Sequence, residues 1–102
     1  MQYQLVVQVK DVGSGDFERL VNWENALAEY LGPSATVDGH DLGAGEFNVF
    51  IFTDDPVGTF QSIRGFAEAR PPPESMAAAY RLVNSDEYIV LWPPESLSFD
   101  IA

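Results

Sequence analysis

The sequence predicts an α+β domain in which two helices cover one face of an antiparallel sheet. Three observations support this fold class. Runs of β-branched and aromatic residues indicate five strands, and two further segments carry apolar residues at helical spacing. Glycine, proline or aspartate stands between these seven segments. The order is β-α-β-β-α-β-β, and its first six elements match the βαββαβ plan of the ferredoxin-like fold. Right-handed crossovers then predict strand order 2-3-1-4, with the fifth strand beside the fourth and both helices on one face.

Residues 2–10 are expected to form the first strand, because apolar and polar side chains alternate along them. One face of this strand carries Tyr3, Leu5, Val7 and Val9. The other face carries Gln4, Val6, Gln8 and Lys10. Since the second face is half polar, we expect that side of the sheet to meet water or a partner.

The first helix is expected to run from an N-cap at Ser14 to about Leu31, where Gly32 and Pro33 end it. Its apolar side chains share one broad arc, and Glu24 falls inside that arc. A carboxylate among apolar side chains needs a partner, because an unpaired buried charge is very costly.

Two arginines are candidates for a structural ion pair with Glu24. Arg81 lies in an apolar strand, and Arg64 follows Ile63 on the second helix. Two alternatives stay open at this point. Glu24 reaches solvent at the rim of the helix, or it acts as a proton-transfer group in a pocket under the sheet.

The most apolar strand, residues 47–54, is β-branched or aromatic on both faces, which is typical of a strand covered on both sides. A strand at residues 35–41 precedes it, and the glycine-rich turn at 42–45 makes the two strands antiparallel. Asp55 is an N-cap, and Pro56 stands at the first helical position. The second helix is therefore expected from Pro56 to about Ala69.

The proline-rich residues 70–75 predict a stiff linker. Residues 76–83 have helical propensity, but the turn at 84–86 and the clear strand at 87–92 favour a strand, from Ala79 at the latest. Residues 97–101 alternate again, so they are expected either to add an edge strand or to dock on a neighbour.

The chain of 102 residues fits one domain, and an apolar content of 46% is enough to build a core.

The chain has no cysteine, which excludes disulfides, thiolate metal sites and cysteine nucleophiles. No stretch approaches the ~20 apolar residues of a membrane helix. The first residues enter a strand directly, so no signal peptide is expected. We therefore expect a cytoplasmic protein.

The formal net charge is −11, from 16 acidic and 5 basic residues. Nucleic acid and anionic membranes are poor partners for such a chain, because binding them needs clustered lysine and arginine. A cationic protein would be attracted and steered. The simpler interpretation is that the acidity only keeps the domain soluble.

The stretch from Asp38 to Pro56, together with Tyr80-Arg81 and Leu91-Trp92-Pro93, resembles an uncharacterised family of small bacterial ferredoxin-like proteins. The resemblance covers about half of the chain, and its most specific part is the glycine-rich turn followed by EFNVFIFTDDP. It implies a fold and no established activity. In size and charge, the chain is also similar to immunity proteins that accompany polymorphic toxins.

Four polar residues gather around one predicted turn: Asp38, His40, Asp41 and Glu46. Together with Trp92, which ends a strand, they are the candidate ligand-binding residues. A histidine among carboxylates can bind a divalent ion or act as a base. Because the chain has one histidine and no cysteine, we predict no metal site and no catalytic residue. The structural alternative is a polar hairpin end whose aspartates bond turn amides.

The leading functional hypothesis is a small acidic protein-interaction domain, immunity-type or regulatory, that binds a cationic protein partner and needs no cofactor. One alternative is a small-molecule-binding module or enzyme built as a sheet-to-sheet homodimer, similar to dimeric α/β-barrel proteins. Its pocket would be lined by Gln4, Gln8, Asn48 and Trp92. Another is an ACT-like sensor with its effector at residues 13–15 or 43–45. Fold alone does not choose among these hypotheses.

Overall fold

The computed structural model describes residues 2–13, 15–72, 75–96 and 98–101. Its five antiparallel strands follow the order β2-β3-β1-β4-β5. In chain order the elements are β1 (Tyr3–Val9), α1 (Phe17–Leu31), the 3₁₀ turn η1 (Gly32–Ser34), β2 (Thr36–Gly43), β3 (Glu46–Thr53), α2 (Pro56–Ala69), β4 (Met76–Leu82) and β5 (Ile89–Trp92). The structure is therefore the predicted ferredoxin-like fold with an added edge strand.

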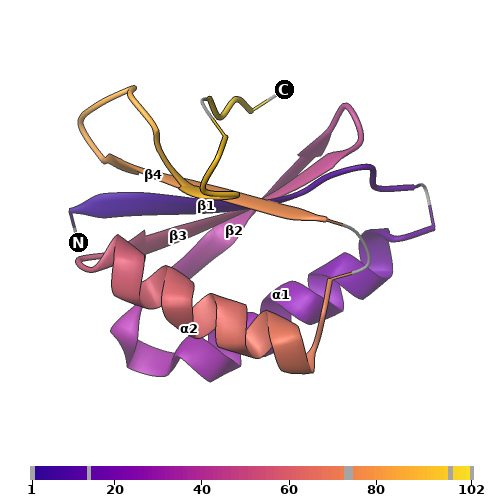
Figure 1. Cartoon of the computed structure of the whole chain (residues 1–102). Coiled ribbons are helices and arrows are strands. Elements are labelled where there is room, and N and C mark those ends of the chain that lie inside the picture. The colour runs from indigo at the N-terminus through magenta and orange to yellow at the C-terminus, as the bar shows by residue number, and fades with distance from the viewer. Residues whose placement is uncertain (1, 14, 73–74, 97, 102) are drawn as a thin grey trace.

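Both helices lie on the same face of the sheet (Figure 1). The core between the two layers consists of fully buried apolar side chains from both, including Leu5, Val7, Val9, Leu20, Leu27, Phe47, Val49, Ile51 and Ile63. Each fully buried side chain of this kind stabilises the fold by about 1.5–3 kcal/mol relative to an exposed one. The odd-numbered residues of β1 thus face the helices, as the alternation predicts. Within the described residues, neither helix has the length and apolar character needed to cross a bilayer.

Helix α2 begins as predicted. Asp55 is its N-cap, and Oδ1 of Asp55 accepts a hydrogen bond of 3.0 Å from the backbone N–H of Gly58. Pro56 occupies the first turn, where its missing N–H would have no intrahelical acceptor. The cap and the proline together define the start of the helix.

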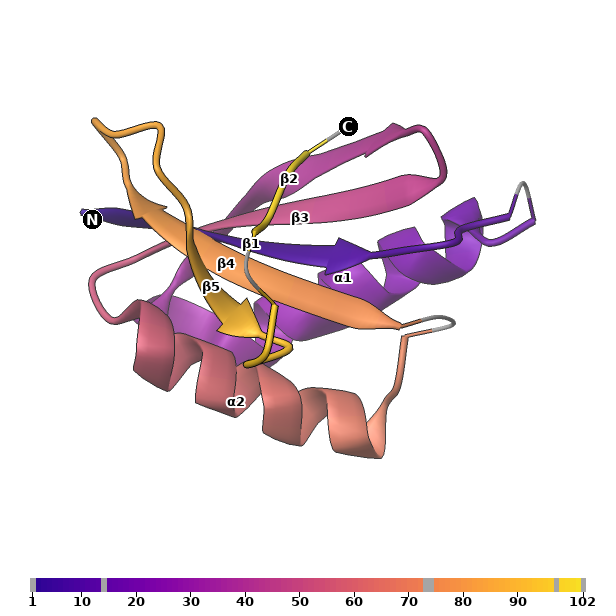
Figure 2. The same cartoon turned by 45° about the horizontal axis from the view of Figure 1, so that its top comes forward.

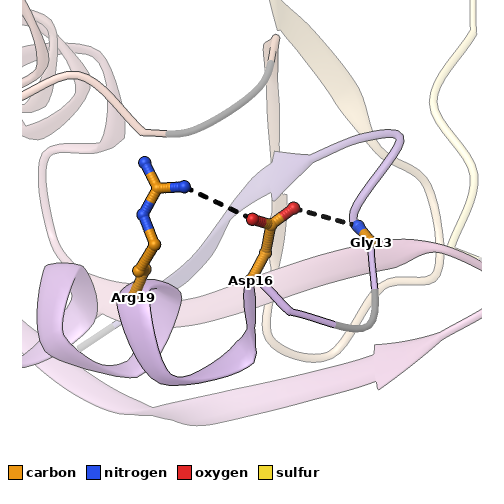
Figure 3. A network of polar contacts seen from close by, with 3 residues as sticks. All are labelled: Gly13, Asp16 and Arg19. Atoms are coloured by element: carbon orange, nitrogen blue, oxygen red, sulfur yellow. Dashed lines mark hydrogen bonds and ion pairs between the residues drawn. The ribbon is translucent and has the colours of Figure 1, made fainter.

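The N-cap residue of α1 is Asp16, whereas the predicted N-cap Ser14 lies outside the described residues. Figure 3 shows that the Asp16 carboxylate turns back toward the preceding loop: Oδ2 accepts a hydrogen bond of 3.0 Å from Gly13 N–H. Oδ1 of Asp16 lies 3.4 Å from Nη1 of Arg19. The Asp16 carboxylate is therefore occupied by Gly13 N–H and Arg19.

Strand β5 is shorter than the predicted strand at residues 87–92. Of the two alternatives for the tail, the added edge strand is not formed by the described residues 98–101. The tail instead crosses the face of the sheet opposite the helices (Figures 1 and 2). We call this side the open face. Nε2 of Gln8 donates a 3.0 Å hydrogen bond to the Asp100 carbonyl, and the Tyr88 and Phe99 rings lie 5.3 Å apart.

Candidate functional site

Glu24 is paired with His40. Oε1 of Glu24 lies 2.7 Å from Nδ1 of His40, and the Glu24 residue is only 6% exposed. The His40 side chain remains 29% exposed. The prediction that a buried Glu24 has a partner is confirmed, but the prediction of an arginine as that partner is wrong.

Both arginines proposed for Glu24 are engaged elsewhere. Arg81 lies opposite Gln4 in the β1–β4 pairing, and its Nε donates a 3.0 Å hydrogen bond to Oε1 of Gln4. Gln4 belongs to the open face, so the whole sheet separates Arg81 from α1. The Arg64 guanidinium lies 4.1 Å from the centroid of the Trp92 ring. This geometry is a cation–π contact on the β5 side of the domain.

A β-bulge brings His40 to the helix side of the sheet. Val37 lies opposite Ile51 and His40 lies opposite Val49, while the register shifts between Val37 and Gly39. In a regular strand, residues 37 and 40 would point to opposite faces. The bulge adds one residue, so both side chains face the helices. Gly39 has φ of 147°, which favours glycine at this point.

Two aromatic rings contact the imidazole of His40. It stacks on Phe47, with ring centroids 4.8 Å apart and an angle of 24° between the planes. Phe17, the first residue of α1, meets the imidazole edge-on at 5.7 Å. Leu42 lies opposite Phe47 in the β2–β3 pairing and on the same side of the sheet. Phe17 is 44% exposed and Leu42 is 45% exposed, so with His40 they form one surface that we call the β2-edge patch.

This arrangement limits what His40 can do chemically. Because Nδ1 bonds Glu24, Nε2 is the nitrogen left for another molecule. With Glu24 ionised and the imidazole neutral, Nδ1–H donates to the carboxylate, and Nε2 presents a lone pair. Nε2 can then accept a hydrogen bond, take a proton or ligate a metal. Among the described residues, no three histidine, aspartate or glutamate side chains gather closely enough to hold a metal ion.

The predicted cluster around the turn is divided by the sheet. His40 faces the helices, whereas Asp41 lies opposite Asn48 on the open face. Oε1 of Glu46 also belongs to the open face and lies 3.2 Å from Nε2 of Gln8. Asp38 is exposed at the bulge. The fifth candidate, Trp92, lies at the opposite edge of the sheet, where its ring is 6.5 Å from that of Phe60.

A polar cluster lies on the open face under the C-terminal tail. Gln8 and Asn48 are each 1% exposed, and Gln8 Nε2 donates a 2.9 Å hydrogen bond to Asn48 Oδ1. Of the two alternatives for this face, water or a partner, water is excluded at Gln8, because the tail lies over it. A cavity of ≈ 250 Å³ remains beside the tail, lined in part by Gln8, Lys10, Glu46, Trp92 and Asp100. Of the pocket residues predicted for a dimer, Gln4 and Asn48 are not in its lining.

The two glycine-containing loops proposed for an effector lie against each other. Val12 N–H donates a 2.8 Å hydrogen bond to the Gly45 carbonyl, which ties the β1–α1 loop to the β2–β3 turn. Two exposed residues beside His40, Phe17 and Leu42, were not among the candidate residues that the sequence indicated. The available signal was position, because Phe17 is the first residue of α1 and Leu42 is the last residue but one of the edge strand β2.

No protein-family model, curated protein or solved structure matches this chain.

Proposed function

We propose that this protein is an acidic protein-interaction domain, immunity-type or regulatory, that binds a cationic segment of another protein. The observation that carries the proposal is the placement of charge. Most of the acidic side chains are exposed; in the described residues these are Asp11, Glu18, Glu29, Asp38, Asp41, Asp54, Asp55, Glu68, Asp86, Glu87, Glu95 and Asp100. A net charge of −11 on a domain of this size attracts and steers a cationic partner.

Few basic groups offset this acidic surface, and most of them contact a single neighbouring side chain. Arg19 meets Asp16, Arg81 bonds Gln4, Arg64 lies over Trp92, and the Arg70 guanidinium is 5.8 Å from the Phe66 ring. Lys10 is exposed. Over the part of the chain that the structure describes, the positive charges are thus spread over several elements and form no surface that suits nucleic acid.

Two features favour this function over a sheet-to-sheet dimer. Two copies of a chain with a charge of −11 repel each other. The tail also lies over the open face, where Asp100 accepts a hydrogen bond from Gln8, so stacking two sheets would require the tail to move.

Selection from a library of random displayed peptides, followed by measured affinities of the selected peptides, tests the proposal. The enriched peptides should carry net positive charge, and their affinity should fall as salt rises. Charge-reversed versions, with aspartate in place of each lysine or arginine, are the matched controls and should not bind. Enrichment of neutral or acidic peptides, or equal binding by the charge-reversed controls, would overturn the proposal.

A further inference from the structure

Strand β2 forms one edge of the sheet (Figure 2), and His40 on this strand contacts Phe17 at the start of α1. It pairs with β3 on one side, so its outer row of backbone N–H and C=O groups is not used by the sheet. After the bulge, the register is regular from Gly39 to Gly43. A short stretch of regular strand is therefore available for an extended segment to pair with.

The β2-edge patch flanks this strand on the helix side. Phe17 and Leu42 expose 44% and 45% of their surface beside an unpaired strand edge. Exposed apolar side chains at such an edge are an association hazard that proteins ordinarily avoid. On the open side of the same strand, Asp41 is exposed. The two sides of β2 therefore differ in chemistry, one apolar and one acidic.

The Glu24–His40 pair is an independent observation at the same place. Burying a carboxylate is costly, and this one is used to hold a partly exposed imidazole at 2.7 Å. Stacking on Phe47 also fixes the plane of the ring. The imidazole is thus oriented before any partner arrives, with Nε2 available to a hydrogen-bond donor.

We infer that the outer edge of β2 is the docking site for an extended segment of the cationic partner, an inference that rests on the proposed function. The segment adds a strand beside β2. Its side chains alternate between apolar residues, which cover Phe17 and Leu42, and basic residues, which meet Asp41 and the exposed Asp38. At the one helix-side position beside His40, a hydrogen-bond donor replaces the apolar residue and bonds Nε2 of His40.

The charge of β2 favours a different protein at this edge over a second copy of the same chain. Pairing β2 with another β2 would bring Asp38 and Asp41 close to the same residues of the second copy. Like charges facing each other across strands are destabilising. A basic segment turns the same carboxylates into favourable contacts.

Two synthetic peptides with the same numbers of lysine and valine test the inference. In one peptide the two residues alternate, and in the other they stand in two blocks. Isothermal titration should show the alternating peptide binding about tenfold more tightly, because only its pattern matches a strand with one apolar and one acidic side.

Backbone amide NMR shifts of the protein should change along residues 39–43 of β2 when the alternating peptide binds. Methylating the backbone nitrogens on one edge of the alternating peptide should abolish binding, while methylating the other edge should not.

Leu42→Ser should weaken binding of the alternating peptide by about tenfold, since it removes an exposed apolar contact. Ile89→Ser is the matched control, because Ile89 is 54% exposed on β5 at the opposite edge of the sheet. It should leave affinity unchanged.

If the block peptide binds as tightly as the alternating peptide, or if both variants behave alike, docking at β2 is wrong while the proposed function stands. If neither lysine peptide binds better than an aspartate–valine peptide, the proposed function itself fails. A wild-type dimer that Leu42→Ser converts to a monomer would assign the edge to a second copy and overturn the inference.

Discussion

Glu24 on α1 holds the imidazole of His40 on β2, with 2.7 Å between Oε1 and Nδ1. The carboxylate is almost fully buried and the imidazole is partly exposed. This hydrogen bond connects the helix layer to the edge of the sheet. The orientation of a surface residue is therefore set from inside the domain.

Glu24→Leu should lower the free energy of unfolding by about 1–2 kcal/mol, because a hydrogen bond between imidazole and carboxylate is lost while leucine fills much of the space. A double-mutant cycle with His40→Leu, measured by urea denaturation, should give a coupling of about 1 kcal/mol or more. The cycle of Glu24→Leu with Arg81→Leu is the control. Its coupling should be near zero, because Arg81 bonds Gln4 on the open face and the sheet separates it from Glu24. A larger coupling to Arg81 than to His40 would contradict the assigned pair.

Gly39→Ala should destabilise the protein by about 1–3 kcal/mol, because a side chain disfavours the positive φ of 147° at the bulge. A Cβ at Gly39 meets no atom within 4 Å, so the cost comes from the backbone alone. Gly43→Ala is the matched control on the same strand, where a Cβ also meets nothing within 4 Å. Thermal unfolding should separate the two variants. Equal midpoints would show that the bulge tolerates a side chain.

Asp55→Ala should lower the free energy of unfolding by about 1 kcal/mol, the usual cost of losing an N-cap. Asp55→Asn is the control, because asparagine caps helices about as well as aspartate. The measurement is the midpoint of thermal unfolding for the three proteins. An alanine variant as stable as the wild type would mean that the bond to Gly58 contributes nothing.

Gln8→Leu should destabilise the protein by about 1–3 kcal/mol, because Oδ1 of buried Asn48 loses its donor. The change also removes the hydrogen bond to the Asp100 carbonyl, so hydrogen–deuterium exchange at residues 98–101 should become faster. Gln4→Leu on the same strand and face is the control. It should leave exchange in the tail unchanged, since Gln4 accepts its bond from Arg81. Faster tail exchange in both variants would mean that the tail is not anchored through Gln8.

The sequence by itself determined the features that depend on neighbouring residues. Alternation along residues 3–9 assigns the buried face of β1, because side chains of a strand point to opposite sides. The start of α2 follows from Asp55 and Pro56, which act within one turn of helix. The strand order follows from the short list of connections that such an element order permits.

Only the tertiary structure decided the features that join distant residues. Residues 76–83 have helical propensity, yet Met76–Leu82 is a strand, because pairing with β1 and burial of Ala77, Ala78 and Ala79 outweigh a weak local preference. The partner of Glu24 depended on one extra residue in β2, and a shift of one residue moves a side chain to the other face. The tail's place over Gln8 joins residues 92 apart, a contact that no local pattern encodes.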